Sequence, residues 1–271
     1  DMLNQRIGDK RVLRLITKWL KTGYIENGKR MKQEKGMPQG AVISPILSNI
    51  FLHYALDLWA KDWRIKIAKG DMIIVRYADD FIIGFQHHSE AERFKNELEC
   101  RLREYKLNLH PEKTRLIEFG RYAAENRRQR KEGKPESFNF LGFTHMCSRN
   151  KKHGYYEIRR MTIKKRFRKK IAEVKAELKK RMHDKVKETG DWLKSVIIGH
   201  QNYYAVPGNL DLVKEFRKQV LRAWLKTLRR RSQKGRLLTW AHFNKIIDWL
   251  IPGVHVKHPY PNVRFDARYS R

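Results

Sequence analysis

The stretch that decides the fold is residues 72–85, MIIVRYADDFIIGF. Two runs of β-branched and aromatic residues flank Ala78-Asp79-Asp80, so the pattern predicts a β-hairpin with acidic residues at its tip. Two adjacent carboxylates repel each other unless a cation compensates them. Mg²⁺ would supply that charge, because it binds few protein carboxylates and completes its shell with water and substrate phosphates. The plainer interpretation, in which the pair only solvates a turn, stays open at this point.

Signals for helices, strands and loops continue on both sides of this hairpin. Apolar residues at spacings of three and four predict helices, β-branched runs predict strands, and glycine clusters predict loops. In chain order the pattern predicts a helix over 10–22, a loop region over 24–40, a helix over 44–58, the hairpin, a helix over 89–106, a strand near 116–119, a basic loop over 121–136 and a strand near 138–143. This mixture predicts an α+β fold.

The character of the chain changes near residue 160. Apolar residues recur every three or four positions from Ile163 to Met182 and predict one long helix. Similar patterns predict three further helices, around 191–205, 210–231 and 239–250. Together these helices predict an all-α bundle. We therefore expect two domains, residues 1–158 and residues 159–271.

The charge of the chain indicates a polyanionic partner. The sequence contains 61 Lys and Arg against 29 Asp and Glu, a formal charge of +32. Nucleic acid is the usual partner of such a surface, because binding releases the counterions condensed on its phosphates. A membrane surface is the weaker alternative. The 12 Phe, 11 Tyr and 7 Trp indicate that the chain folds and is not a disordered basic tail.

The two cysteines, Cys100 and Cys147, are too few for a disulfide framework or a cysteine-based zinc site. The sequence has neither a long uninterrupted apolar run nor the apolar core of a signal peptide near its start. We therefore expect an intracellular protein, in a bacterial cytoplasm or an organelle, with no membrane partner. Because residue 1 is not Met, we also expect that an upstream portion precedes it.

Two motifs that occur in order carry a resemblance to a known family. Residues 76–81, Arg-Tyr-Ala-Asp-Asp-Phe, resemble the Y-A-D-D active-site hairpin of reverse transcriptases, particularly those encoded by group II introns. Upstream, residues 36–50, GMPQGAVISPILSNI, are similar to the P-Q-G-x-x-x-S-P-x-x-x-N segment of that family. The resemblance implies a right-hand palm, built from an antiparallel hairpin sheet with helices, followed by an all-α thumb or maturase bundle.

Further segments extend the resemblance over essentially the whole chain. Residues 107–114 (LNLHPEKT) look like the next palm motif, 140–143 (FLGF) like the primer-grip segment, 198–204 (IGHQNYY) like the G-x-x-N-Y-Y signature of the thumb, and 221–225 (LRAWL) like the next thumb helix. In this family the fingers and the first palm strand would precede residue 1. That strand carries another metal-binding aspartate, and Asp1 matches a position just after it.

The resemblance implies roles for individual residues. Asp79 and Asp80 are expected to be catalytic and to bind two Mg²⁺ ions together with a third carboxylate upstream of residue 1. Lys113 is expected to neutralise or protonate the leaving pyrophosphate. The expected nucleotide-binding and template-primer-binding residues are Pro38, Gln39, Gly40, Tyr77, Ala78, Leu141 and Gly142. The expected RNA-binding residues are Lys164, Lys165, Arg166, Arg168, Lys169, Lys170, Asn202, Tyr203, Tyr204 and Arg222.

Several alternatives stay open. Lys113 could be one exposed lysine among many, residues 140–143 a core strand with a glycine bulge, and Tyr203 and Tyr204 part of the bundle core. The expected function is RNA-directed DNA synthesis with a maturase role, using group II intron RNA as template, a DNA primer or target DNA, and dNTPs. The alternatives are an RNA-binding splicing cofactor without polymerisation, or a reverse transcriptase recruited to a CRISPR or diversity-generating system. The sequence predicts no oligomeric state.

Overall fold

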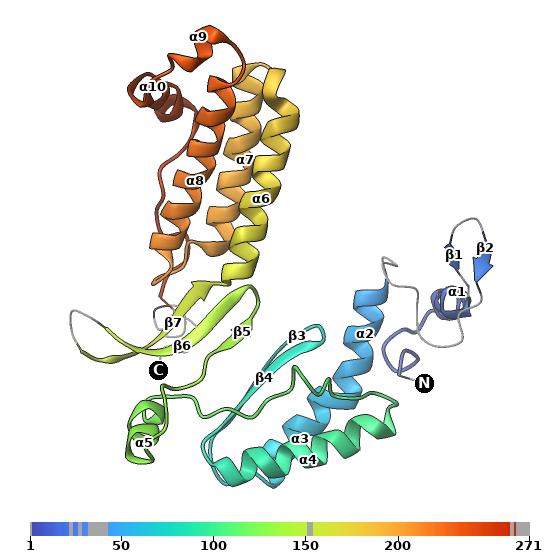
Figure 1. The fold of residues 1–271 in the computed structure, drawn as a ribbon. Helices are drawn as coiled ribbons and strands as arrows, with labels where there is room; N and C mark the ends of the chain where they lie inside the picture. The colour runs from blue at the N-terminus through green and yellow to red at the C-terminus, as the bar shows by residue number, and fades with distance from the viewer. Residues whose placement is uncertain are drawn as a thin grey trace. The chain divides into compact units, whose positions relative to one another are not determined.

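The computed structural model describes residues 2–21, 24–26, 29–31, 43–150, 154–260 and 263. It contains helices and small antiparallel sheets, which confirms the predicted α+β class (Figure 1). The chain divides into two compact units, residues 1–116 and residues 117–271, and each unit has its own core. The expected functional boundary between residues 158 and 159 stays a prediction. The division by packing falls earlier, because the last sheet is hydrogen-bonded to the helices that follow it.

The first unit consists of helices and two antiparallel hairpins. In chain order it contains α1 (Lys10–Lys21), β1 (Tyr24–Glu26), β2 (Lys29–Met31), α2 (Ser44–Leu52), the π-helical segment η1 (His53–Asp57), α3 (Leu58–Lys66), β3 (Met72–Tyr77), β4 (Asp80–Phe85) and α4 (His88–Glu104). β1 pairs with β2 and β3 pairs with β4, both antiparallel. The predicted hairpin at residues 72–85 is therefore confirmed.

The core of the first unit explains which face of this hairpin is buried. Met72 is buried and Ile74 half-buried on the face that packs against Trp63 and Phe94, whereas Ile73 is exposed. This alternation follows from the two-residue period of a strand. The remaining buried members of the cluster are Leu56, Ala60, Leu98 and Leu102. The cluster therefore fixes the base of the hairpin and leaves its tip free of the core.

The second unit places a three-stranded sheet beside a helical bundle. In chain order it contains α5 (Ala123–Gln129), β5 (Phe138–Phe140), β6 (Phe143–Arg149), β7 (Tyr156–Thr162), α6 (Lys164–Lys180), the 3₁₀ segment η2 (Arg181–His183), α7 (Val186–Tyr204), α8 (Leu210–Arg229), α9 (Gln233–Arg236) and α10 (Trp240–Leu250). The sheet order is β5-β6-β7, and all pairs are antiparallel. α6 and α7 both pack against α8 (Figure 1).

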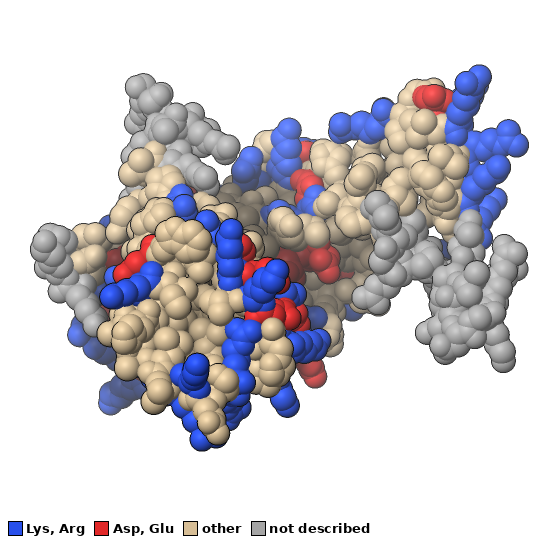
Figure 2. All heavy atoms as spheres, turned by 90° about the horizontal axis from the view of Figure 1, so that it is seen from above, with Lys and Arg blue, Asp and Glu red and all other residues tan. Residues whose placement is uncertain are grey.

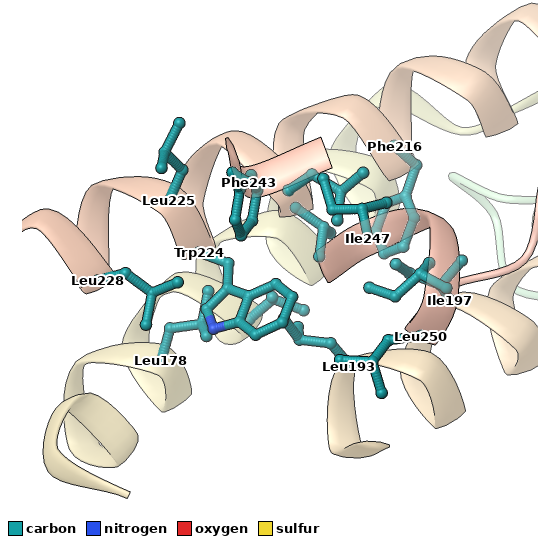
Figure 3. Close-up of a cluster of buried hydrophobic side chains, with 14 of the residues drawn as sticks. Leu178, Leu193, Ile197, Phe216, Trp224, Leu225, Leu228, Phe243, Ile247 and Leu250 are labelled. Atoms are coloured by element: carbon teal, nitrogen blue, oxygen red, sulfur yellow. The ribbon is translucent and has the colours of Figure 1, made fainter. Parts of the chain in front are cut away.

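The apolar faces of these helices meet in one core. Trp224 is fully buried among side chains from α6, α7, α8 and α10, and its ring lies 5.1 Å from that of Phe243 (Figure 3). The other buried positions recur at helical spacing, as in Ile171, Val174 and Leu178 of α6. The sequence pattern therefore predicted the correct faces of the bundle, and the four predicted helices are confirmed as α6, α7, α8 and α10.

Three local predictions were wrong. Residues 116–119 form an extended loop and no strand, because they have no neighbouring strand to pair with in the described part of the chain. The basic stretch 121–136 contains the short helix α5, whose polar and charged residues mostly face solvent while Ala123 is buried. The helix expected over 44–58 continues through η1 and α3 to Lys66, because residues 46–66 contain neither Gly nor Pro to end it. Among the described residues, no helix is both long and apolar enough to cross a membrane.

Candidate active site and nucleic-acid interface

The tip of the β3–β4 hairpin presents the two adjacent aspartates to solvent. Tyr77 pairs with Asp80, so Ala78 and Asp79 form a two-residue loop. Ala78 has φ +54°, a left-handed conformation that costs about 1 kcal/mol for a residue with a side chain. Asp79 and Asp80 are both exposed. Such strain is kept only where neighbouring groups hold the backbone in place.

Arg76 is the group that holds this turn. Its Nε and Nη2 donate to Oδ1 and Oδ2 of Asp57 at 2.7 and 2.5 Å, a bidentate pair. Its Nη1 donates to Asn49 Oδ1 at 2.8 Å and to the Ala78 carbonyl at 2.9 Å. The guanidinium therefore ties the strained turn to α2 and to the π-helical segment η1. π-Helical turns occur frequently at functional sites, and this one supplies Asp57.

The charge of Asp57 is stabilised by the same contact. Partial burial raises the pKa of this carboxyl group, but the hydrogen bonds and the positive charge of Arg76 outweigh burial, and the pKa lies below its ordinary value. The pKa of Arg76 is raised, first by its hydrogen bond to Asp57. Both partners therefore stay charged at neutral pH. The Arg76–Asp57 contact that anchors the turn should not change with small shifts of pH around neutrality.

The aspartate pair has the chemistry of an incomplete metal site. Asp79 and Asp80 make no ion pair within the residues that the structure describes, so nothing there neutralises their charges. Two solvent-facing carboxylates without a cation are suitable ligands for Mg²⁺. No group of three or more His, Cys, Asp or Glu side chains comes together in the described ranges. Asp1 lies outside these ranges. In the family resemblance it matches a position just after the strand that carries the third metal-binding aspartate.

The other predicted residues of this unit are Lys113, which the structure describes, and Pro38, Gln39 and Gly40, which it does not. Lys113 is exposed in a turn in which its backbone N–H donates to the His110 carbonyl at 3.2 Å. Its side chain makes no hydrogen bond or ion pair in the part of the chain that the structure describes. The expected Pro38, Gln39 and Gly40 lie outside the described residues.

The second unit contains a turn that brings together predicted residues from distant parts of the sequence. Leu141 and Gly142 join β5 to β6, and their φ values of +45° and +82° are both positive, as a type I′ turn requires. The Tyr203 hydroxyl donates to the Leu141 carbonyl at 2.8 Å, 62 residues away in sequence. The backbone N–H of Ile163 donates to the Gly142 carbonyl at 3.1 Å. The structure therefore joins the predicted primer-grip segment to the predicted thumb signature.

Tyr204 and Arg166 complete the surroundings of this turn. A Cβ atom added to Gly142 would lie 3.1 Å from Tyr204 Oη and 3.3 Å from Arg166 Nη1. The Phe143 ring lies parallel to that of Tyr203, with an interplanar angle of 11° and centroids 5.9 Å apart. The positive φ of residue 142 therefore favours Gly, and a side chain there would also require Tyr204 and Arg166 to shift.

Sequence reasoning missed one residue that supports this region. Asn209 is almost fully buried, accepts from the Thr162 backbone N–H at 2.9 Å, and donates to Thr162 Oγ1 and to the Tyr204 carbonyl, both at 2.8 Å. It links the end of β7 to the end of α7. Pro207-Gly208-Asn209 before an apolar helix is a detectable signal, but it predicts only a turn and a helix cap. The side chain of Asn209 in fact makes no cap bond to its own helix.

His200 lies under Tyr204 on the inner side of α7. Its ring stacks on Phe216 with centroids 3.7 Å apart, and only 7% of the residue is exposed. Neither ring nitrogen has a hydrogen-bond partner among the described residues. Burial, with a smaller contribution from Lys170, lowers the pKa of His200 to about 4. The imidazole is therefore neutral in the folded protein at physiological pH.

We expect His200 to make the second unit less stable in acid. The unfolded pKa is about 6.5, so this contribution is fully present above that pH and is lost as pH falls toward 4. Between pH 7.5 and pH 5 the loss amounts to about 2 kcal/mol of unfolding free energy. Urea unfolding at both pH values measures it. His200→Phe should abolish this part of the pH dependence, whereas His183→Phe, at an exposed position, should keep it. An unchanged pH dependence in His200→Phe would contradict the assignment.

The exposed faces of the bundle carry the predicted cations. Lys164, Lys165, Arg166, Arg168, Lys169 and Lys170 are all exposed on α6, and Asn202, Tyr203 and Arg222 are exposed as well. Of the α6 cations, Lys170 pairs with Glu173 at 3.4 Å. α8 adds a row in which every fourth residue is an exposed cation, Lys214, Lys218, Arg222 and Lys226, and the exposed Arg230 continues this spacing just after the helix ends. On the face drawn in Figure 2, Lys and Arg side chains are more widespread than Asp and Glu.

Comparison with known proteins agrees with the motifs at the hairpin. The family model described as reverse transcriptase (RNA-dependent DNA polymerase) matches residues 3–145. The group II intron-encoded protein LtrA of Lactococcus lactis subsp. cremoris is 42% identical over 65 residues, which cover 24% of this chain and 11% of LtrA. The putative COX1/OXI3 intron 2 protein of Saccharomyces cerevisiae is 30% identical over 139 residues, 51% of this chain and 14% of that protein.

Protein YkfC of Escherichia coli (strain K12) is 33% identical over 144 residues, which cover 42% of this chain and 37% of YkfC. The chain thus spans well under half the length of each of these relatives. The family match covers more than half of the chain and includes the hairpin with Asp79 and Asp80. The chain belongs to the reverse transcriptase (RNA-dependent DNA polymerase) family, and its relatives confirm the predicted resemblance to group II intron-encoded reverse transcriptases.

Proposed function

We propose that this protein is an RNA-directed DNA polymerase of the group II intron type that also binds intron RNA as a maturase. The observation that carries the proposal is the hairpin tip, where Asp79 and Asp80 are exposed, uncompensated and held on a strained turn by Arg76. The family match over this segment supports it. In this proposal residues 1–158 contribute part of the palm, and residues 159–271 form the thumb or maturase domain.

Reverse transcriptases use divalent metal ions, and Asp79 and Asp80 are the residues that would hold Mg²⁺ here. When bound, the ions increase the acidity of the primer 3′-hydroxyl and neutralise charge on the leaving pyrophosphate. Arg76 keeps the two carboxylates at the end of the hairpin, so catalysis relies on positioned charge. Tyr77 and Ala78 flank the primer end, and Lys113 offers a cation to the nucleotide phosphates.

The remaining template and primer contacts follow the same proposal. The Leu141–Gly142 turn contacts the primer strand through the half-buried Leu141, and Pro38, Gln39 and Gly40 contact the template-primer from the preceding loop. The cations of α6 and the row on α8 bind RNA phosphates, since successive members of that row are about 6 Å apart along the helix. Asn202 and Tyr203 add polar and stacking groups for unpaired bases. The proposed partners are intron RNA, a DNA primer or target DNA, and dNTPs.

Primer extension on an RNA template of mixed sequence tests the activity. The longest reading frame that contains this chain is incubated with Mg²⁺, a labelled DNA primer and one dNTP at a time. We expect extension only with the dNTP complementary to the next template base. If the folded protein binds the RNA but extends no primer, polymerisation is rejected, and the splicing-cofactor alternative is favoured.

We expect exposed α6 cations to determine the salt dependence of RNA binding. Replacing Arg168 and Lys169 by Gln removes two cations that have no ion-pair partner among the described residues. The slope of log K against log salt should therefore fall by about 1.5, and affinity should fall with it. Arg93→Gln with Arg103→Gln is the matched control, since it removes the same charge from α4 arginines that are paired with Glu97 and Glu99. Equal slopes for the two double variants would contradict a specific role for α6.

A further inference from the structure

Leu141 adopts a backbone conformation that its side chain disfavours. Its φ of +45° lies in the left-handed region, and Leu is a branched residue that rarely occurs there. Most two-residue hairpin loops of this kind use Asn or Gly at that position. Strained residues persist where the surrounding structure fixes them, and they gather at functional sites. Contacts from outside the turn are therefore expected to hold Leu141 in this conformation.

The hydroxyl group of Tyr203 holds the strained residue directly. It donates to the Leu141 carbonyl at 2.8 Å, while the Tyr203 ring is kept in place by its parallel contact with Phe143. The next carbonyl, that of Gly142, accepts from Ile163 at the start of α6. Tyr204 and Arg166 lie close to Gly142, so a side chain there would require both of them to shift. Both carbonyls of the turn are thus fixed by the bundle.

The turn is partly buried and borders an exposed side chain, because Leu141 is half-buried and Gly142 is buried. Tyr203 is 49% exposed, whereas Tyr204 beside it is half-buried and contacts His200. A tyrosine that served only as bundle core would be buried, and one that served only as a stacking platform would not need its hydroxyl. Arg166 is exposed next to the turn and supplies a cation for a backbone phosphate of a bound strand.

We propose that Tyr203 is a positioning residue for DNA synthesis, whose hydroxyl keeps the Leu141–Gly142 turn in the conformation that binds the primer strand. This rests on the proposed function of the turn as a primer grip. It assigns the Tyr203 hydroxyl a role through hydrogen bonding to the turn, in addition to the stacking role proposed for its ring.

Tyr203→Phe separates these roles, because it keeps the aromatic ring and removes only the hydroxyl group. In steady-state primer extension we expect the KM for primer-template to rise roughly five-fold, with a smaller change in kcat, since one hydrogen bond is lost. RNA affinity and thermal midpoint should stay close to wild type. Tyr122→Phe is the matched control, since Tyr122 is 66% exposed in the same unit, and it should leave the KM unchanged.

A second substitution tests whether strain at Leu141 is the cause. Glycine adopts a positive φ without strain, so Leu141→Gly in the Tyr203→Phe background should return the KM to within about two-fold of wild type. A KM for Tyr203→Phe equal to that of wild type overturns the proposal, as does failure of Leu141→Gly to rescue it. Failure of the wild-type protein to extend any primer would instead reject the proposed function itself.

Discussion

Asp79→Asn and Asp80→Asn should each reduce primer extension by about 10³-fold or more, while RNA affinity changes little. Each change removes a negative charge from the hairpin tip and keeps the shape of the side chain. Without that charge the hairpin should lose the proposed Mg²⁺ ligands, whereas the cations proposed to bind RNA lie on other elements. Extension rates at saturating dNTP and RNA binding by filter retention measure the two effects separately.

Asp71→Asn is the matched control for these variants. Asp71 is exposed at the opposite end of the same hairpin, and its backbone rather than its side chain makes the hydrogen bonds with Gln86. The control variant should extend primers at the wild-type rate. Loss of RNA binding together with activity in the tip variants would indicate that the aspartates support the fold and not catalysis.

Asn209→Ala should lower the unfolding free energy of the second unit by about 3 kcal/mol. The substitution leaves the Thr162 N–H and hydroxyl groups without their buried partner, and the Tyr204 carbonyl keeps only the Val206 N–H as donor. Each unsatisfied buried group costs about 1–3 kcal/mol, and partial relaxation brings the sum below simple addition. Because Tyr204 and Thr162 flank the Leu141–Gly142 turn, primer affinity should fall as well.

Urea unfolding followed by circular dichroism measures the effect of Asn209→Ala. Asn202→Ala is the control, since Asn202 is exposed on the same unit and should lose less than about 0.5 kcal/mol. A loss below about 1 kcal/mol in Asn209→Ala would show that its three hydrogen bonds are replaced by solvent, and that Asn209 is not a structural link.

The sequence allowed good prediction of elements with a strong period. The β3–β4 hairpin and the apolar faces of α6 and α8 follow directly from spacing, because these residues bury one face of a regular element. The start of α7 was placed five residues late, since Val186 to Gly190 include polar residues and a glycine. Strand β7 was missed because its Arg159 and Arg160 obscure the alternation typical of a strand.

The parts of the site that depend on tertiary contacts could not be predicted. Nothing in the local sequence around Leu141 indicates that its carbonyl accepts from Tyr203, and nothing around Arg76 indicates that it binds Asp57 in a π-helical turn. Such contacts join residues 19 to 62 positions apart. The motif resemblance predicted which residues are functional, and packing determined which of them meet.

The proposed roles of the hairpin residues depend on different observations from those of Lys113, Pro38, Gln39 and Gly40. The hairpin roles have support from exposure, strain and the Arg76 contact. The others depend on the resemblance alone, because Lys113 has no described side-chain contact and residues 38–40 lie outside the described ranges. Substitutions at the hairpin are therefore the sharper tests.

The most direct test of the central claim is incorporation of dTTP on poly(rA)/oligo(dT) in Mg²⁺, by the wild-type protein and by the Asp79→Asn, Asp80→Asn double variant. The account predicts template-dependent DNA synthesis by the wild type and its loss in the folded double variant, with binding to poly(rA) retained. Synthesis that persists in the double variant, or none by a wild-type protein that binds the template-primer, would contradict it.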